Sequence, residues 1–341
     1  MIYIAIFLLL IGIALIVFLS TGPKISVTDN QLIKEVQETP VEEHITGITG
    51  TANNNGVTIF YNAFGKPEKG NILLVNGHTQ TLLDWPTYFF QPLVDAGYRV
   101  IRYDNRGVGM SDWMEGWNKT NAYTLEDMAT DALAILDDLS IKKAHIIGVS
   151  MGGMISQRLA ISHADRVLSL CSIMSTGYYF DKELTNVPRQ FMLDITRISM
   201  RYGRDVKPEA NKLKLHLAIR QLLKGKGKYP FDTKSILKKA LYEVRKRRAY
   251  NMKATDQHSL AIKKSGSRYE GLKQIQMPVL VVHGTTDPLI GIAHAKKYAA
   301  MIPNAETLFI EGMGHDLPET YMPQIIEGIL SNCMHNSDTY V

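Results

Sequence analysis

Short apolar runs alternate with amphipathic stretches along most of the chain after residue 45. Residues 56–65 alternate in the manner of a half-buried strand, and residues 71–77 form a continuous apolar run ended by glycine, as a buried parallel strand does. Further strands are predicted at 98–104, 144–149, 166–174, 277–284 and 305–312, and helices at 87–97, 124–139, 151–162, 294–302 and 321–333. This alternation with short connections predicts a mostly parallel, doubly wound α/β sheet.

The alternation is interrupted between residues 178 and 264, where the pattern is helical in period. Residues 210–223 and 233–244 are both amphipathic, and Gly225–Pro230 separates them. A helical insertion between two strands predicts a cap over the carboxyl edge of the sheet, where ligands of open α/β sheets bind. The expected organisation is an α/β core at 46–177 and 266–334, a helical cap at 178–265 and a tail at 335–341.

The N-terminal segment is the clearest outlier in hydrophobicity. Residues 2–19 are eighteen apolar residues without a charge, which would span about 27 Å as a helix, close to the roughly 30 Å hydrocarbon core. The segment predicts a single transmembrane anchor over residues 1–20. A cleaved signal peptide is the alternative, but no Lys or Arg precedes the run and no small-x-small cleavage site follows it.

The residues after this run bear on orientation and on the connection to the body. Lys24 and Lys34 follow the span and no basic residue precedes it. This asymmetry favours a membrane-anchored protein whose folded body lies on the cytoplasmic side. Residues 21–45 are polar and contain two prolines, so they predict a juxtamembrane linker.

The charge distribution separates the cap from the rest of the chain. The formal net charge is only +5, but residues 178–264 hold 22 Lys and Arg against 8 Asp and Glu, whereas the remainder holds 16 against 25. Two interpretations remain open: a solvated basic surface, or a cap that includes the run RKRR (245–248) and rests on anionic lipid beside the anchor. Nucleic acid is not expected as a partner, because the cap lacks interleaved aromatic residues and any nucleic-acid motif.

A single serine stands between two glycines where a predicted strand meets a predicted helix. Gly148, Ser150 and Gly152 fit G-x-S-x-G in the strand–turn–helix context that this motif requires, with Ser150 exposed on a tight turn. The alternatives are a simple turn and a phosphate-binding loop, but for the latter neither G-x-x-x-x-G-K-[ST] nor G-x-G-x-x-G is present here. The pattern therefore predicts Ser150 as a nucleophile.

A base and an orienting acid are expected later in the chain, in the order Ser, Asp, His. Asp287 follows the strand 277–284, and His315 follows the strand 305–312. Both positions lie on the sheet edge that would display Ser150, so the three residues are predicted to form a catalytic triad.

No metal or organic cofactor is expected, because no H-E-x-x-H motif and no Cys/His cluster with ligand spacing occurs. Two cysteines far apart do not form a disulfide framework.

The tetrahedral intermediate of acyl transfer also needs hydrogen-bond donors for its oxyanion. The backbone N–H of Met151, directly after the nucleophile, is one expected donor, and the N–H of His78, in the loop after strand 71–77, is the other.

Other polar residues near the predicted site receive structural interpretations. Asp316 is expected to cap the last helix, and His283 is expected to be a satisfied histidine at the end of a buried strand. Asp104 and Arg106 are expected to form a charge pair in a structural loop.

With these residues in view, the chain resembles the α/β-hydrolase superfamily. The stretches LLVNGHTQTLLDWP, VIRYDNRGVGMSD, GVSMGGMISQRLA and GMGHDLP resemble in particular its aclacinomycin methylesterase-like branch of carboxylic ester hydrolases. The resemblance covers roughly residues 50–330 and implies the α/β-hydrolase fold, the same roles for the triad and the two amides, and a small-molecule acyl ester as substrate. The apolar N-terminal run and the basic cap depart from the pattern, so the polyketide ester of that branch is not carried over.

The resemblance leaves alternatives of function. An acyltransferase or a monoglyceride-type lipase would use the same triad, and a non-catalytic ligand-binding protein would use the same fold. An acceptor alcohol that competes with water for the acyl-enzyme would distinguish the first of these from a hydrolase.

Overall fold

The structure is a computed structural model that describes residues 17–18, 20–184, 187–203, 205, 208–248 and 251–334. In these residues one sheet runs in the order β1-β2-β4-β3-β5-β6-β7-β8. The strands are β1 (Ile48–Asn54), β2 (Val57–Phe64), β3 (Asn71–Val75), β4 (Arg99–Tyr103), β5 (Ala144–Val149), β6 (Val167–Ile173), β7 (Val279–Gly284) and β8 (Glu306–Ile310). Strand β2 pairs antiparallel with both β1 and β4, and all other pairs are parallel. The mostly parallel sheet expected from the sequence is therefore present.

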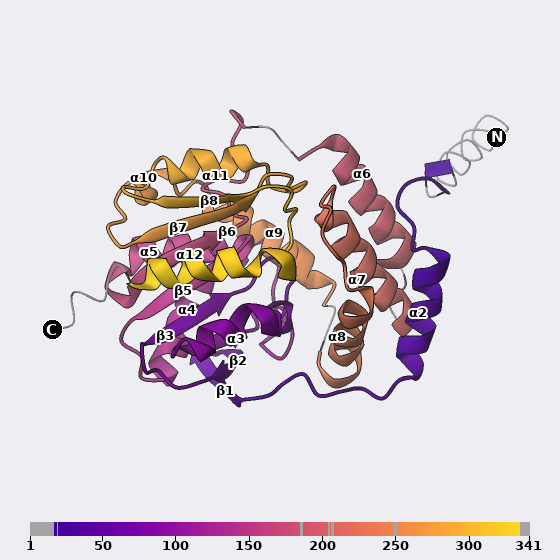
Figure 1. Ribbon diagram of the computed structural model, residues 1–341, viewed down its shortest axis with the longest axis horizontal. Helices are drawn as coiled ribbons and strands as arrows, with labels where there is room; N and C mark the ends of the chain where they lie inside the picture. The colour runs from indigo at the N-terminus through magenta and orange to yellow at the C-terminus, as the bar shows by residue number, and fades with distance from the viewer. Residues whose placement is uncertain are drawn as a thin grey trace.

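Helices cover both faces of this sheet (Figure 1). Helices α3 (Thr87–Asp95) and α12 (Met322–Met334) pack on one face together with Ile72 and Leu74 of β3. The intervening Leu73 points to the other face, where it joins a separate apolar cluster that includes residues of α4 (Leu125–Asp138) and α5 (Met151–Ser162). Because β3 is covered on both sides, it reads as an unbroken apolar run rather than an alternating one.

The second face continues towards β7 and β8. Helices α10 (Tyr269–Leu272) and α11 (Ile292–Ala299) form an apolar cluster there with β6 and β7. The remaining short elements are the turns of 3₁₀-helix η1 (Leu82–Asp84), η2 (Ala164–Arg166) and η4 (Glu319–Tyr321).

A helical group lies beside the sheet, between β6 and β7 in the chain (Figure 1). Its elements are α6 (Arg189–Ile198), the π-helical turn η3 (Ser199–Gly203), α7 (Glu209–Lys224), α8 (Thr233–Lys246) and α9 (Lys253–Ser265). Helices α6 to α8 have an apolar core of their own, separate from the clusters of the sheet. We call α6 to α9 the cap.

The segment expected to be a linker contains helix α2 (Val27–Glu38). The Ser26 side chain caps its first turn by accepting a hydrogen bond from the Asp29 N–H. Ile33 and Val36, one turn apart, are 1% and 0% exposed in the apolar core of the cap. The segment thus docks on the cap, because two correctly spaced apolar residues suffice to dock a mostly polar helix.

Strand β1 was not predicted either. Its sequence ITGTANN contains little apolar surface, and only Ala52 is buried. The strand forms because it completes a hairpin with β2, with Ile48 opposite Ala63 at its start.

In the part of the chain that the structure describes, no helix is both long and apolar enough to cross a membrane. The transmembrane anchor predicted at residues 1–20 lies outside the described residues, apart from residues 17, 18 and 20.

Candidate active site

Ser150 occupies the tight turn between β5 and α5. Its backbone angles, φ 56° and ψ −119°, lie in a region that side-chain-bearing residues rarely adopt. The glycines two positions away make this turn possible: a Cβ at Gly148 would collide with the carbonyl of Gly152, and a Cβ at Gly152 would collide with the carbonyl of Val75 in β3. The N–H of Ser150 donates to the Ile173 carbonyl of β6 at 2.8 Å, which fixes the turn to the neighbouring strand.

The structure brings Ser150, His315 and Asp287 into one hydrogen-bonded row. The Ser150 Oγ lies 3.0 Å from His315 Nε2, and His315 Nδ1 lies 2.7 Å from Asp287 Oδ2. A carboxylate only accepts, so Nδ1 carries the proton and Nε2 is free to accept the Ser150 hydroxyl proton. Ser150 and His315 are each 8% exposed, and the side chain of Asp287 is fully buried behind them.

Asp287 is held by its own loop in a fixed orientation. Its Oδ1 accepts the N–H groups of Leu289 and Ile290, both at 2.8 Å. Burial by itself would raise the pKa of Asp287, but the charge and hydrogen bond of His315, together with the Ile290 N–H, lower it below its ordinary value. The carboxylate is therefore ionised at neutral pH and orients the His315 ring.

The two amides expected to bind an oxyanion flank Ser150. Met151 is the first residue of α5, where an N–H has no acceptor within the helix. His78 follows Gly77, and Gly77 is so close to the nucleophile that a Cβ there would lie 3.2 Å from Ser150 Cβ. The loop after β3 thus lies directly against the serine and leaves little room for a side chain at position 77.

The cap contacts the loop that carries His315. The side chain of Arg220 in α7 forms a 2.6 Å ion pair with Asp316. Asp316 was expected to cap the last helix, which was wrong: the chain first passes through η4, and α12 begins only at Met322. Asp316 instead connects the histidine loop to the cap.

Asp104 and Arg106 do not pair with each other, which corrects the sequence-based interpretation. Arg106 forms a buried, two-pronged pair with Asp131 of α4, at 2.6 Å for both contacts. Asp104 pairs with Arg247 of α8, which also binds Glu243 at 2.8 Å. Although Asp104 and Arg106 are two positions apart, their side chains point in opposite directions because the loop turns between them.

The sequence did not indicate that Glu243 and Arg247 contact the loops beside the candidate site. The Glu243 carboxylate accepts a hydrogen bond from the Thr81 hydroxyl, in the loop that also carries His78. Burial raises the pKa of Glu243, although Arg247 opposes this shift. Both residues lie in a strongly basic stretch that reads as solvated surface, so no sequence signal distinguished them.

His283 lies at the end of β7 and is fully buried, as expected, but the expectation of a satisfied ring holds for only one of its two nitrogens. Its Nε2 is 2.7 Å from the Ile290 carbonyl, in the loop of Asp287. Within the described residues its Nδ1 has no hydrogen-bond partner. Burial lowers the pKa of His283, so the ring is neutral beside the ionised Asp287.

No three His, Cys, Asp or Glu side chains are grouped so as to hold a metal ion in the portion of the chain that is described. Both cysteines, Cys171 and Cys333, are buried free thiols. Burial raises the pKa of each thiol, so neither is a reactive thiolate.

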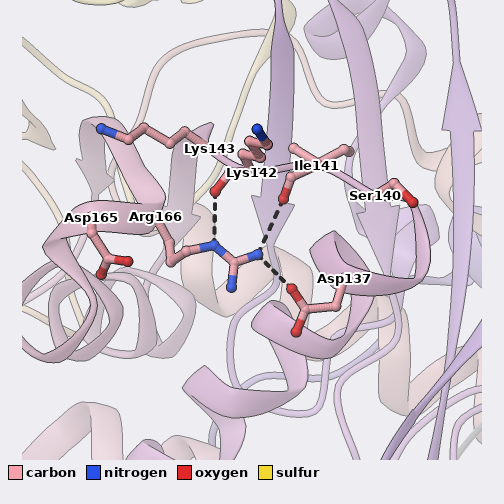
Figure 2. A pocket seen from close by; sticks show the side chains of 7 residues that line it. All are labelled: Asp137, Ser140, Ile141, Lys142, Lys143, Asp165 and Arg166. Atoms are coloured by element: carbon pink, nitrogen blue, oxygen red, sulfur yellow. Dashed lines mark hydrogen bonds and ion pairs between the residues drawn. The ribbon is translucent and has the colours of Figure 1, made fainter.

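Two surface hollows lie away from Ser150. The larger, about 450 Å³, is at the amino end of β5, opposite the edge that carries the serine, and Figure 2 shows the Arg166 guanidinium among its lining residues. Arg166 binds Asp137 at 2.6 Å there and donates to the carbonyls of Lys142 and Ile141 through its Nε and one terminal nitrogen. The second, about 290 Å³, lies between α3 and α12. The lining residues of both hollows include no nucleophile with an adjacent base.

Comparisons with known proteins agree with this fold. A family model described as alpha/beta hydrolase fold matches residues 70–320. The chain is 30% identical to rhodomycin D methylesterase DnrP of Streptomyces peucetius, over 79% of this chain and 93% of that protein, and 30% identical to rhodomycin D methylesterase DauP of Streptomyces sp. strain C5, over 77% and 90%. Among solved structures, an esterase from Exiguobacterium antarcticum superposes with a TM-score of 0.63 at 18% identity, covering 84% of this chain and all of that one.

Proposed function

The chain belongs to the α/β-hydrolase family and is a carboxylic ester hydrolase, and we propose that it cleaves its ester through an acyl-enzyme on Ser150. The observation that carries this proposal is the row from Ser150 through His315 to Asp287, with a strained serine at one end and an ionised carboxylate at the other. The strain presents the hydroxyl to a ligand rather than to the helix that follows.

The reaction proceeds in two halves. His315 Nε2 accepts the Ser150 hydroxyl proton as Oγ attacks the ester carbonyl, and Asp287 holds the ring in the required tautomer. The N–H groups of His78 and Met151 stabilise the oxyanion, each contributing about 2.7–4 kcal/mol to lowering the barrier. His315 then gives its proton to the departing alkoxide. Water, deprotonated by the same ring, attacks the acyl-enzyme and releases the acid.

The test is turnover of p-nitrophenyl esters over a series of acyl chain lengths. Ser150→Ala should lower kcat by at least about 10³-fold, since the nucleophile and base act as a unit. Ser162→Ala is the matched control, because Ser162 is exposed at the far end of the same helix and should leave kcat within about twofold of the wild type. Equal turnover by Ser150→Ala and the wild type would rule out this mechanism.

The same assay separates hydrolysis from acyl transfer. Glycerol or another alcohol is added, and the fraction of acyl product formed as a new ester is compared with the free acid. A hydrolase should release mostly acid at modest alcohol concentration, whereas an acyltransferase would give mainly the new ester.

We also propose that residues 1–20 anchor the protein in a membrane as a single span, with the folded body on the cytoplasmic side. The support is the eighteen-residue apolar run and its connection to the cap. Arg197 of α6 donates to the Phe18 carbonyl at 3.2 Å, and Arg201 donates to the carbonyls of Thr21 and Pro23. An anchor would therefore leave the bilayer directly beside α6.

Fractionation tests the anchor. The full chain should remain in the membrane pellet after alkaline carbonate washing, and a chain that begins at residue 20 should move to the supernatant with its esterase activity intact. This truncation keeps α2, which contributes to the core of the cap. Recovery of the full chain in the supernatant would contradict the proposal.

Lipid binding by the cap itself is a separate question, answered by sedimenting the truncated chain with vesicles that contain or lack anionic lipid. Part of the RKRR run is already engaged within the protein, since Arg247 is buried and Arg245 pairs with Glu209. Any preference for anionic vesicles must therefore come from the remaining exposed cations. Equal sedimentation with both kinds of vesicle would favour the solvated-surface interpretation of the cap.

A further inference from the structure

The loop after β3 has three consecutive amides, of which two are engaged. The N–H of Gly77 donates to the Gln80 side chain at 2.8 Å, and the N–H of Thr79 donates to Nδ1 of His258 at 3.0 Å. Among the described residues, no hydrogen bond is made by the N–H of His78, which lies between them. The direction of that middle N–H is set by the peptides on both sides.

Thr79 has an unfavourable backbone conformation that needs support. Its φ is 57°, in the left-handed region, where a β-branched residue is strained. The hydrogen bond from its own N–H to His258 is therefore a direct restraint on the strained residue.

His258 belongs to the cap and is itself rigidly held. It lies on α9, its side chain is fully buried, and its Nε2 is 2.8 Å from the Arg106 carbonyl. Since Nδ1 accepts from Thr79, Nε2 must carry the proton that it donates to Arg106, so one neutral tautomer satisfies both contacts. Burial lowers the pKa of His258 to about 3, which keeps Nδ1 available as an acceptor at neutral pH.

Helix α9 contacts the preceding residue of the same loop as well. The side-chain Nε2 of His78 lies 3.2 Å from the Thr255 carbonyl and 3.1 Å from the Ser259 hydroxyl. The rings of His78 and His258 meet edge to face, with centroids 5.6 Å apart. Two successive residues of the loop are thus fixed by one turn of the cap helix.

We propose that His258 is a positioning residue for the oxyanion hole: by accepting from Thr79 it fixes the His78 N–H towards the reacting carbonyl, so that the cap sets the geometry of the hole. This inference rests on the proposed function of Ser150 and His78. It assigns to α9 a role in stabilising the transition state.

Two substitutions distinguish the roles of the two ring nitrogens of His258. In His258→Asn the side-chain Oδ1 takes the place of Nδ1 and can still accept from Thr79. In His258→Gln the amide nitrogen takes the place of Nε2 and can still donate to Arg106, but the acceptor for Thr79 is lost. Because loss of an oxyanion donor costs about 10²–10³ in kcat, its misplacement in His258→Gln should lower kcat by about 10- to 100-fold, with KM within about twofold. His258→Asn should retain kcat within about threefold of the wild type.

Binding of a transition-state analogue provides a second measurement beside the kinetics. Binding of a trifluoromethyl ketone, whose adduct places an oxyanion in the hole, should weaken in His258→Gln by a factor similar to the loss of kcat, while binding of a substrate-like amide should not change. The proposal is overturned if the wild type is active and the Asn and Gln variants have the same kcat.

An inactive wild type, or a fully active Ser150→Ala, would instead refute the proposed function. Should both His258 variants fail to fold, measurements on the wild type decide the matter. The Thr79 amide should exchange slowly with solvent, and the nitrogen chemical shifts of His258 should report a neutral ring protonated at Nε2. Rapid exchange at Thr79, or protonation at Nδ1, would overturn the inference.

Discussion

The backbone N–H of His315 donates to the carbonyl oxygen of Leu223, 2.9 Å away in the last turn of cap helix α7. His315, the proposed general base, is thus held through its backbone by the cap and through its ring by Asp287. The helix end offers its free carbonyls for this purpose, because the last carbonyls of a helix have no partner within it. The cap and the histidine loop therefore form one structural unit.

Gly314→Ala should disturb this unit. A Cβ at Gly314 would collide with the carbonyl of Lys224, so either α7 or the histidine loop must shift. We expect a loss of about 1–3 kcal/mol in the free energy of unfolding and at least about a tenfold loss of kcat, since His315 moves with its loop. Urea unfolding and ester turnover measure the two effects. Gly116→Ala is the control, because a Cβ there meets nothing within 4 Å; similar values for both variants would contradict the prediction.

Asp287→Asn should lower kcat by about 10⁴ while the protein remains folded. The asparagine can present its NH₂ group to His315 Nδ1, which favours the tautomer with the proton on Nε2 and prevents that nitrogen from accepting the Ser150 proton. Turnover of the optimal p-nitrophenyl ester is the measurement. Asp165→Asn, at an exposed position far from the site, is expected to match the wild type. A loss of less than about tenfold in Asp287→Asn would show that another group orients the ring.

Arg247→Met and Arg245→Met should differ sharply although the residues are two positions apart. Arg247 is buried between Asp104 and Glu243, so its loss leaves two buried carboxylates without a cation and should cost about 3–5 kcal/mol in the free energy of unfolding. Arg245 is exposed, pairs with Glu209 and donates to the Gln37 carbonyl, so its loss should cost less than about 1 kcal/mol. Denaturant titration checks both, and equal costs would refute the assignment of Arg247 as the buried cation.

Much of the sheet could be predicted because its strands are buried on both sides. A run such as NILLV has one interpretation, and the strand–serine–helix context of Ser150 then identifies the edge at which Asp287 and His315 emerge. Topology brings these three residues to one edge, since parallel strands have their carboxyl ends on the same side of the sheet.

The contacts from the cap could not be predicted in this way. His258, Glu243 and Arg247 act on loops more than 140 residues away in sequence, and their helices have ordinary amphipathic patterns. Helix α2 was missed for a related reason: its two buried apolar residues become meaningful only beside α7 and α8. A pairing between distant segments leaves no local pattern in one sequence.

The stability of the protein should fall as the pH is lowered from about 6.5 towards 4. Burial lowers the pKa of His145 to about 4 from an ordinary value of 6.5, so in this window the unfolded chain binds a proton that the folded protein refuses. The contribution of His145 is complete above pH 6.5, decreases by about 1 kcal/mol per pH unit through the window, and levels off below pH 4. His145→Gln removes this proton, so the slope of unfolding free energy against pH should be shallower in the variant by that amount, whatever its stability at pH 7.5. Urea unfolding at pH 7.5, 6.5, 5.5 and 4.5 measures both slopes. Parallel curves for the variant and the wild type would mean that His145 gains its proton without unfolding, in conflict with a ring that is 4% exposed and bound to Ser169 at 2.9 Å.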